Sequence, residues 1–151
     1  MTAECEIPPD VPGTRTLVAV FAGPVAEHLV HFGGHAGFRT VLVDPRTDRG
    51  SIDADDDTDI VVADHHRPEL GHMLKEALAG KSRWIGVIGS PRHPAPHVDA
   101  LKALGVSDED IARVHRPIGL NIGSRTPGEI AIATLAGLIA DRNGRPGGFT
   151  H

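Results

Sequence analysis

The sequence predicts an α/β protein: a Rossmann-like three-layer sandwich with a mostly parallel sheet and helices on both faces. Short unbroken apolar runs, such as residues 17–21, are typical of strands that a parallel sheet buries on both sides. These runs alternate with segments whose apolar residues recur at helical spacing. Such an alternation favours right-handed crossovers between parallel strands.

The first half of the chain supplies most of the sheet. Strands are expected at residues 17–21, 40–43, 60–63 and 84–88. A helix stopped by Gly37 joins the first two strands, and its apolar positions are Val25, Leu29, Phe32 and Ala36. A helix ended by Gly80 follows the third strand, and its buried stripe is expected at Leu70, Leu74, Ala77 and Leu78.

The second half is expected to be helical. One helix closes at Gly105 and carries Val98, Leu101 and Leu104, and a short helical segment runs from Ser107 through Ile111 and Val114. The last helix has the clearest start, because Thr126 suits the N-cap, Pro127 the first turn, and Glu129 can complete a capping box. Its apolar stripe is expected at Ile132, Leu135, Ala136 and Ile139, and it ends at Asn143 and Gly144.

Length and composition limit the class of protein. A chain of 151 residues, 40% of them hydrophobic, suits one domain with an aliphatic core. We expect a flexible N-terminal arm over residues 1–15, a Rossmann-like domain over residues 16–143 and a loose tail over residues 144–151. The net charge of −5 argues against nucleic-acid binding. Without a signal segment or an apolar run of about 20 residues, a cytoplasmic protein with no membrane partner is expected.

Three features of the sequence carry no predicted metal or redox site. Cys5 is the single cysteine, so neither an internal disulfide nor a cysteine-based zinc site is expected. The acidic run over residues 53–57 reads as a solvated loop. His28, His31 and His35 share one helical face away from the apolar stripe, which indicates a solvated polar face.

Ligands of parallel sheets bind beyond the carboxyl ends of the strands. The first such loop has Gly23 and Pro24 but Phe21 where a dinucleotide fingerprint has its first glycine. Asp44 follows the second strand, where it could bind a ribose or shape the turn at Pro45. The sequence leaves both roles open.

Three further strand-end or loop positions are candidates. His65 follows the third strand, where an imidazole can hydrogen-bond a ligand or exchange a proton. After the fourth strand, Gly89 permits close approach, Ser90 offers a hydroxyl, and Arg92 could bind a phosphate or lie in an ordinary turn. Gly119 and Gly123 precede the last helix, where free N–H groups favour an anion; a plain tight turn is the alternative.

Three segments together carry a family resemblance: residues 41–46 (VLVDPR), 84–90 (WIGVIGS) and 117–131 (PIGLNIGSRTPGEIA). They resemble the C-terminal Rossmann domain of the XdhC/CoxI family, the xanthine dehydrogenase accessory proteins, over about residues 16–143. The resemblance implies a chaperone-like accessory protein that binds the molybdenum cofactor, as a molybdopterin or its dinucleotide form. It also implies a molybdenum hydroxylase apoenzyme, such as xanthine dehydrogenase, as the recipient.

The resemblance assigns cofactor binding to residues in five loops. These are Gly23, Pro24, Asp44, Arg46, His65, Gly89, Ser90, Gly119, Asn121, Gly123 and Thr126. Full-length members carry an N-terminal domain with a cysteine to which Cys5 does not correspond. Two alternatives stay open: the chain works with a separate protein that supplies that domain, or it is a domain that has lost ligand binding.

Two other functions remain open on the residues alone. One is an NAD(P)-dependent oxidoreductase, although the first loop lacks its leading glycine and no catalytic acid or base can be assigned. The other is a non-catalytic interaction module, for example one that forms a homodimer.

Overall fold

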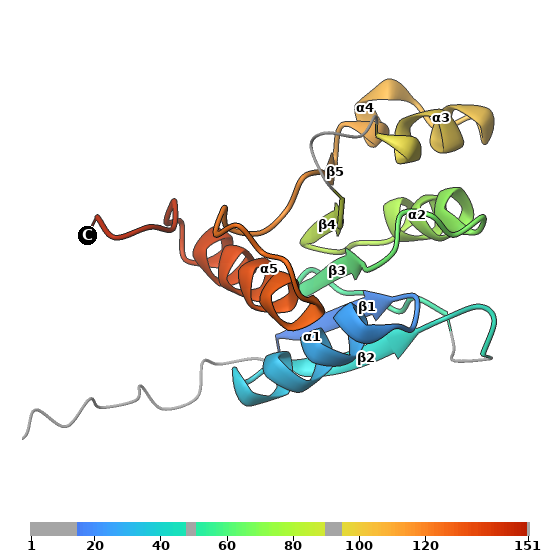
Figure 1. Ribbon diagram of the computed structural model, residues 1–151. Coiled ribbons are helices and arrows are strands. Elements are labelled where there is room, and N and C mark those ends of the chain that lie inside the picture. The colour runs from blue at the N-terminus through green and yellow to red at the C-terminus, as the bar shows by residue number, and fades with distance from the viewer. Residues whose placement is uncertain (1–14, 48–50, 90–94, 151) are drawn as a thin grey trace, which may run out of the picture.

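The computed structural model describes residues 15–47, 51–89 and 95–150. Five parallel strands form a single sheet in the order β2-β1-β3-β4-β5, as Figure 1 shows. The strands are β1 (Thr16–Val20), β2 (Arg39–Val43), β3 (Thr58–Val62), β4 (Trp84–Val87) and β5 (Val114–His115). The direction in which strands are added reverses beside β1, so the switch point lies between β1 and β3. The predicted parallel α/β fold is confirmed.

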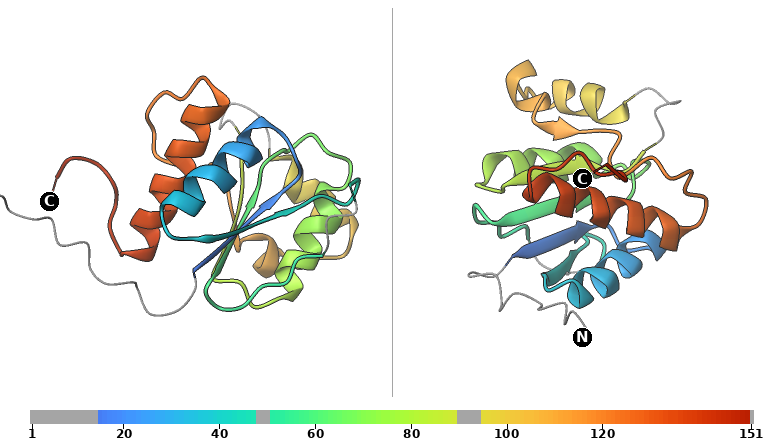
Figure 2. Two further views of the ribbon diagram at one scale, coloured as in Figure 1. Left: turned by 90° about the horizontal axis from the view of Figure 1, so that it is seen from below. Right: turned by 90° about the vertical axis from the view of Figure 1, so that its left-hand side faces the viewer.

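Helices cover both faces of the sheet (Figure 2). α1 (Pro24–His35) and α5 (Pro127–Arg142) lie side by side on one face. α2 (Leu70–Ala79) and α3 (Pro96–Ala103) lie on the other, followed by the short α4 (Asp108–Ile111). No helix in the described part of the chain is long and apolar enough to span a membrane.

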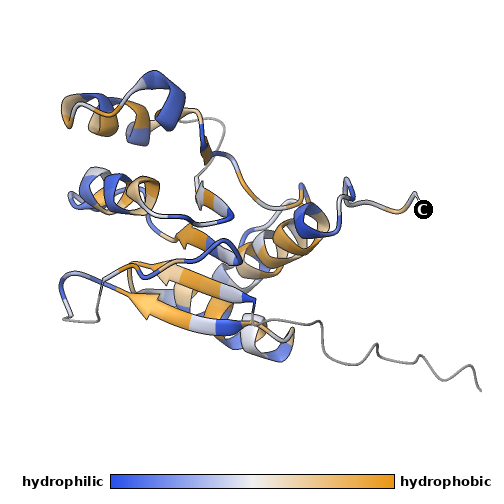
Figure 3. Ribbon diagram, turned by 180° about the vertical axis from the view of Figure 1, so that it is seen from behind, coloured by the Kyte–Doolittle hydropathy of each residue, from blue (hydrophilic) through white to orange (hydrophobic). Residues whose placement is uncertain are grey.

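Side chains of the strands alternate between two cores, because successive residues of a strand point to opposite faces. Leu17 and Val61 pack with Leu29 of α1 and Leu138 of α5. Their neighbours along the strands pack toward α2 and α3, in a cluster that includes Val18, Val20, Ile60, Val62, Met73, Leu74 and Leu101. Figure 3 shows these strands as mostly apolar ribbon and α2 and α3 as helices with a hydrophilic side.

Two predictions about helices are wrong. The short helical segment ends at Ile111 and does not include Val114. Val114 belongs to β5 and pairs with Ile85 of β4. Ile132 is not buried in α5 but is 51% exposed, whereas Ala131, Ala133, Thr134, Leu135 and Leu138 are buried. The periodic pattern fails because α5 is apolar on nearly all sides, so contacts with α1, the sheet and the loop at Gly119 choose its buried side.

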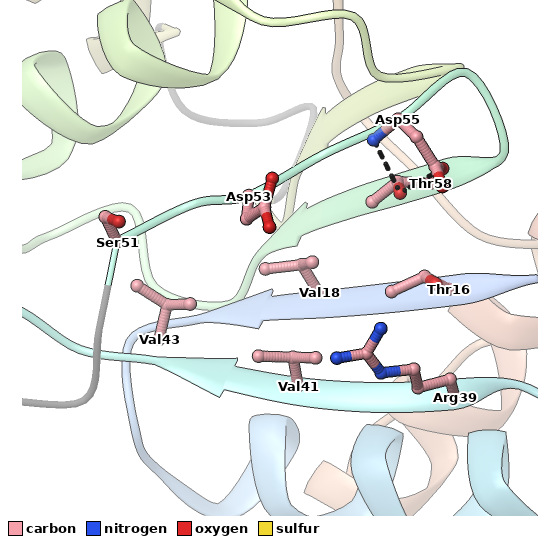
Figure 4. Close-up of a pocket in the computed structure, with 9 residues that line it drawn as sticks. All are labelled: Thr16, Val18, Arg39, Val41, Val43, Ser51, Asp53, Asp55 and Thr58. Carbon is pink, nitrogen blue, oxygen red and sulfur yellow. Dashed lines mark hydrogen bonds between the residues drawn. The ribbon is translucent and has the colours of Figure 1, made fainter.

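The connection between β2 and β3 contains no helix in its described residues, 44–47 and 51–57. Ile52 and Ala54 pack against the core on the α2 side instead. Figure 4 shows Ser51 and Asp53 of this segment above Val41 and Val43 of β2, where they enclose a pocket of about 150 Å³.

The acidic run is a surface loop as predicted, with Asp53, Asp55 and Asp56 exposed. Its last member, Asp57, accepts a hydrogen bond from Arg142 at 2.7 Å, which the pattern did not predict.

A buried ion-pair network joins the amino-terminal edge of the sheet to the end of α5. Asp59 of β3 is completely buried, and its two carboxylate oxygens accept hydrogen bonds from Arg83 and Arg142, each at 2.7 Å. Arg83 also binds Asp141 of α5 at 2.7 Å. These contacts fix α5 at its C-terminal end.

Candidate functional site

The loop after β1 begins with a buried residue in an unusual conformation. Phe21 has a φ of 75°, in the left-handed region that favours glycine, and is 1% exposed. The guanidinium of Arg67 lies 4.8 Å from the centre of its ring. Phe21 thus keeps the backbone shape that a glycine fingerprint would have, while its side chain joins the core on the α2 side.

Gly23 and Pro24 start α1 directly after this turn. Gly23 is the N-cap residue and Pro24 occupies the first turn, and Gly23 makes no side-chain cap. A β-carbon on Gly23 would meet nothing within 4 Å, so open space lies beside this position. The two residues lie at the carboxyl edge of the sheet, as predicted, although they are not among those lining the cleft described below.

Asp44 at the end of β2 is fully occupied by contacts within the protein. Its Oδ2 accepts hydrogen bonds from the Ala22 N–H, at 2.8 Å, and from the Arg67 guanidinium, and its Oδ1 accepts one from the Arg46 N–H at 2.9 Å. Burial raises the pKa of this carboxyl, but the hydrogen bonds and the charge of Arg67 outweigh burial and hold the pKa below its ordinary value. Asp44 is therefore a buried, ionised anchor.

Arg46 lies in the same cluster. Its Nε and Nη2 bind the carboxylate of Glu69 at 2.7 and 2.9 Å, and Arg67 binds Glu69 at 3.1 Å. Sequence reasoning did not single out Arg67 or Glu69. Charged residues just after a strand are common, and nothing in their spacing indicates which carboxylate each arginine meets.

The largest of the described cavities lies next to the carboxyl ends of β3 and β4. It is a cleft of about 580 Å³, walled on one side by the loop over residues 117–124 and by α5. Five predicted site residues line it: His65, Gly89, Gly119, Asn121 and Gly123. Ile88, Ile118, Ile122 and Ile130 add apolar surface. The cleft therefore combines two apolar walls with an imidazole, an amide and exposed glycine backbone.

Among the described residues that line the cleft, His65 has the one ionisable side chain. Burial lowers its pKa, the positive charges of His66 and Arg116 lower it further, and a hydrogen bond to the Ile88 backbone acts in the opposite direction. The imidazole is consequently neutral at neutral pH, so it can both donate and accept a hydrogen bond.

Arg116 is a residue of this region that sequence reasoning missed. A β-carbon on Gly89 would lie 2.3 Å from the Arg116 Nε, so the guanidinium lies directly against this glycine. His97, buried in the first turn of α3, also has its pKa lowered, by burial and by Arg116. Recognising Val114 and His115 as a strand would have placed Arg116 at the same edge of the sheet.

Thr126 is the N-cap of α5, as predicted, but the Glu129 carboxylate binds the N–H of Arg125 and not that of Thr126. The Thr126 Oγ1 accepts a hydrogen bond from the Glu129 N–H at 3.1 Å, while the Glu129 carboxylate accepts one from the Arg125 N–H at 3.0 Å. The N–H groups of Arg125 and Glu129 therefore already have acceptors within the chain, and the Glu129 carboxylate lies at the positive end of the helix. This leaves the cleft side of the loop, rather than the helix start, as the open surface.

Ser90 and Arg92 fall outside the described residues. His28, His31 and His35 are exposed on α1, and no group of three or more metal-ligating side chains occurs within the described ranges.

Comparison with known proteins identifies the family of this domain. The family described as the XdhC Rossmann domain matches residues 17–138. The uncharacterized protein YqeB of Escherichia coli (strain K12) is 35% identical over 101 residues, which are 66% of this chain and 18% of YqeB.

A solved structure described as a xanthine dehydrogenase from Bacillus halodurans has a TM-score of 0.66 and 25% identity, covering 87% of this chain and 44% of that one. The chain spans less than half the length of either relative. The match over most of its length shows that the chain belongs to the XdhC family and carries that family's Rossmann domain.

Proposed function

We propose that the protein binds the molybdenum cofactor and assists the maturation of a molybdenum hydroxylase such as xanthine dehydrogenase. The observation that carries the proposal is the cleft, because it gathers residues from three separate strand-end loops that resemble those of the family. Family membership and the solved relative described as a xanthine dehydrogenase support the same assignment.

The cleft suits the chemistry of this cofactor. Its volume of about 580 Å³ and the apolar surface of Ile88, Ile118 and Ile130 would suit a pterin ring, because burying the ring's apolar faces there would be favourable. The Asn121 amide and the glycine backbone can bind ring heteroatoms, and Arg116 beside Gly89 supplies positive charge for a phosphate. The cofactor, when bound, supplies the metal-dithiolene group that a hydroxylase uses; this chain's residues bind and shield it.

An NAD(P)-dependent oxidoreductase is the weaker candidate. In that class a strand-end carboxylate binds the ribose hydroxyls. Asp44 holds this position, but its side chain is 1% exposed and both oxygens accept hydrogen bonds from the protein.

Fluorescence titration with purified molybdenum cofactor and, separately, with NADPH tests the proposal. We expect saturable binding of the cofactor with micromolar or tighter affinity and only weak binding of NADPH. Asn121→Ala should weaken cofactor binding, whereas Asn143→Ala, a matched change at the exposed end of α5, should not. Tight NADPH binding without cofactor binding would reverse the ranking.

A further inference from the structure

Outside the cleft, a cluster of charged side chains joins the end of β2 to the loop after β3. It consists of Asp44, Arg46, Asp64, Arg67 and Glu69. Asp44 and Arg67 are its centre, with side chains 1% and 13% exposed. The cluster contains the predicted ligand residues Asp44 and Arg46, but neither of them lines the cleft.

We propose that Asp44 is a positioning residue: through Arg67 it holds the loop after β3 in the conformation that places His65 in the cleft, and it contacts no ligand itself. This concerns the same cleft as the proposed function, so the part that involves the cofactor rests on that function.

The hydrogen bonds of Asp44 connect three loops within the protein. Oδ2 accepts from two donors and Oδ1 from one, and two of the three donors are backbone N–H groups, those of Ala22 and Arg46. Asp44 therefore connects three loops: its own, the loop after β1, and the loop after β3 through Arg67. A ligand hydroxyl could reach it only by displacing one of these bonds, at the cost of a buried unpaired group.

The contacts of Arg67 fix the orientation of its side chain. Its guanidinium binds Asp44 and Glu69, lies 3.9 Å from Asp64 and stacks over the Phe21 ring. A planar guanidinium held on its edges and on one face keeps one orientation. Arg67 is two residues beyond His65, and Pro68 restricts the backbone that follows, so fixing Arg67 limits the positions open to His65.

The balance of charges in the cluster also supports a structural role for Asp44. Two arginines face three carboxylates, those of Asp44, Asp64 and Glu69. No excess positive charge remains there for a phosphate.

Histidine NMR of the free, full-length protein tests the proposal without a ligand. We expect Asp44→Asn and Arg67→Gln each to move the His65 titration toward its ordinary value of about 6.5, because a looser loop exposes the imidazole to water. Arg67→Lys, which keeps the charge but loses the planar fork, should give a smaller shift. The matched change Asp56→Asn, at an exposed aspartate, should give none.

His97 is the internal control for the fold, because its pKa is also lowered by burial and by Arg116, which is not a member of the cluster. Its titration should stay unchanged in every variant. If His65 titrates as in the wild type in folded Asp44→Asn and Arg67→Gln, the proposal is wrong.

Binding of purified molybdenum cofactor gives a second readout. Because the two residues act through one pair, the double variant should lose no more affinity than the more affected single variant. Losses that multiply would show that Asp44 contacts the cofactor independently, and would overturn the proposal. If the wild type binds no cofactor, the proposed function fails, while the His65 titration still decides the role of Asp44.

Discussion

The backbones of Gly119 and Gly137 lie in direct contact. A β-carbon on Gly137 would stand 3.2 Å from the Gly119 α-carbon, and one on Gly119 would stand 3.1 Å from the backbone of Ala133. The Leu120 N–H also donates a hydrogen bond to the Ala133 carbonyl at 3.0 Å. The wall of the cleft is therefore fixed to α5 by backbone contacts that are too close for an unstrained β-carbon.

Gly119→Ala should destabilise the protein far more than Gly123→Ala. Both glycines have positive φ, 88° and 69°, so each change costs about 1 kcal/mol of backbone strain. A β-carbon at Gly119 also collides with α5, which adds about 1–3 kcal/mol, whereas one at Gly123 meets nothing within 4 Å. Urea unfolding measures both, and equal losses would contradict the backbone contact.

Asp59→Asn should lower the free energy of unfolding by about 3 kcal/mol, the usual effect of breaking a buried ion pair. Asp59 is fully buried and holds both Arg83 and Arg142. The control is Asp56→Asn at an exposed position in the same segment, which should change the unfolding free energy by less than about 0.5 kcal/mol. A similar small effect at Asp59 would mean that the network does not stabilise α5.

The stability of the protein should fall as the pH drops below about 6.5. His65 and His97 both have lowered pKa values in the folded protein, so between the unfolded and folded values the unfolded chain binds more protons. Their contribution is therefore complete above the unfolded value and is lost as the pH falls toward the folded one. Urea titrations at a series of pH values should show this slope, and the double variant His65→Gln/His97→Gln should reduce it.

Gly123→Val should abolish cofactor binding in a protein that remains folded. The change puts a branched side chain on the wall of the cleft. Its φ of 69° makes the substitution strained, as for Gly123→Ala, but the β-carbon meets no neighbouring atom within 4 Å, so the strain stays in the loop. Fluorescence titration measures affinity, and circular dichroism checks the fold. Unchanged affinity in the folded variant would make this loop structural only.

Much of the architecture could be predicted from local pattern. The apolar run of β1 and the capping residues Thr126 and Pro127 act through neighbours along the chain, so their signals are complete in the sequence. The convergence of His65 and Gly89 on one cleft followed from the rule that parallel strands end at a common edge. Val114 could not be predicted in the same way, because a two-residue strand has no periodicity and exists only by pairing with β4.

The sequence by itself determined the parallel α/β fold, the start of α5 and the loops from which a site could be built. Only the tertiary structure decided which side chains have partners: Asp44 meets Arg67 and the Ala22 N–H, and Arg116 lies against Gly89. The physical reason is range. Propensity, capping and periodicity act over a few residues, whereas ion pairs and glycine contacts depend on how segments far apart in the chain are brought together.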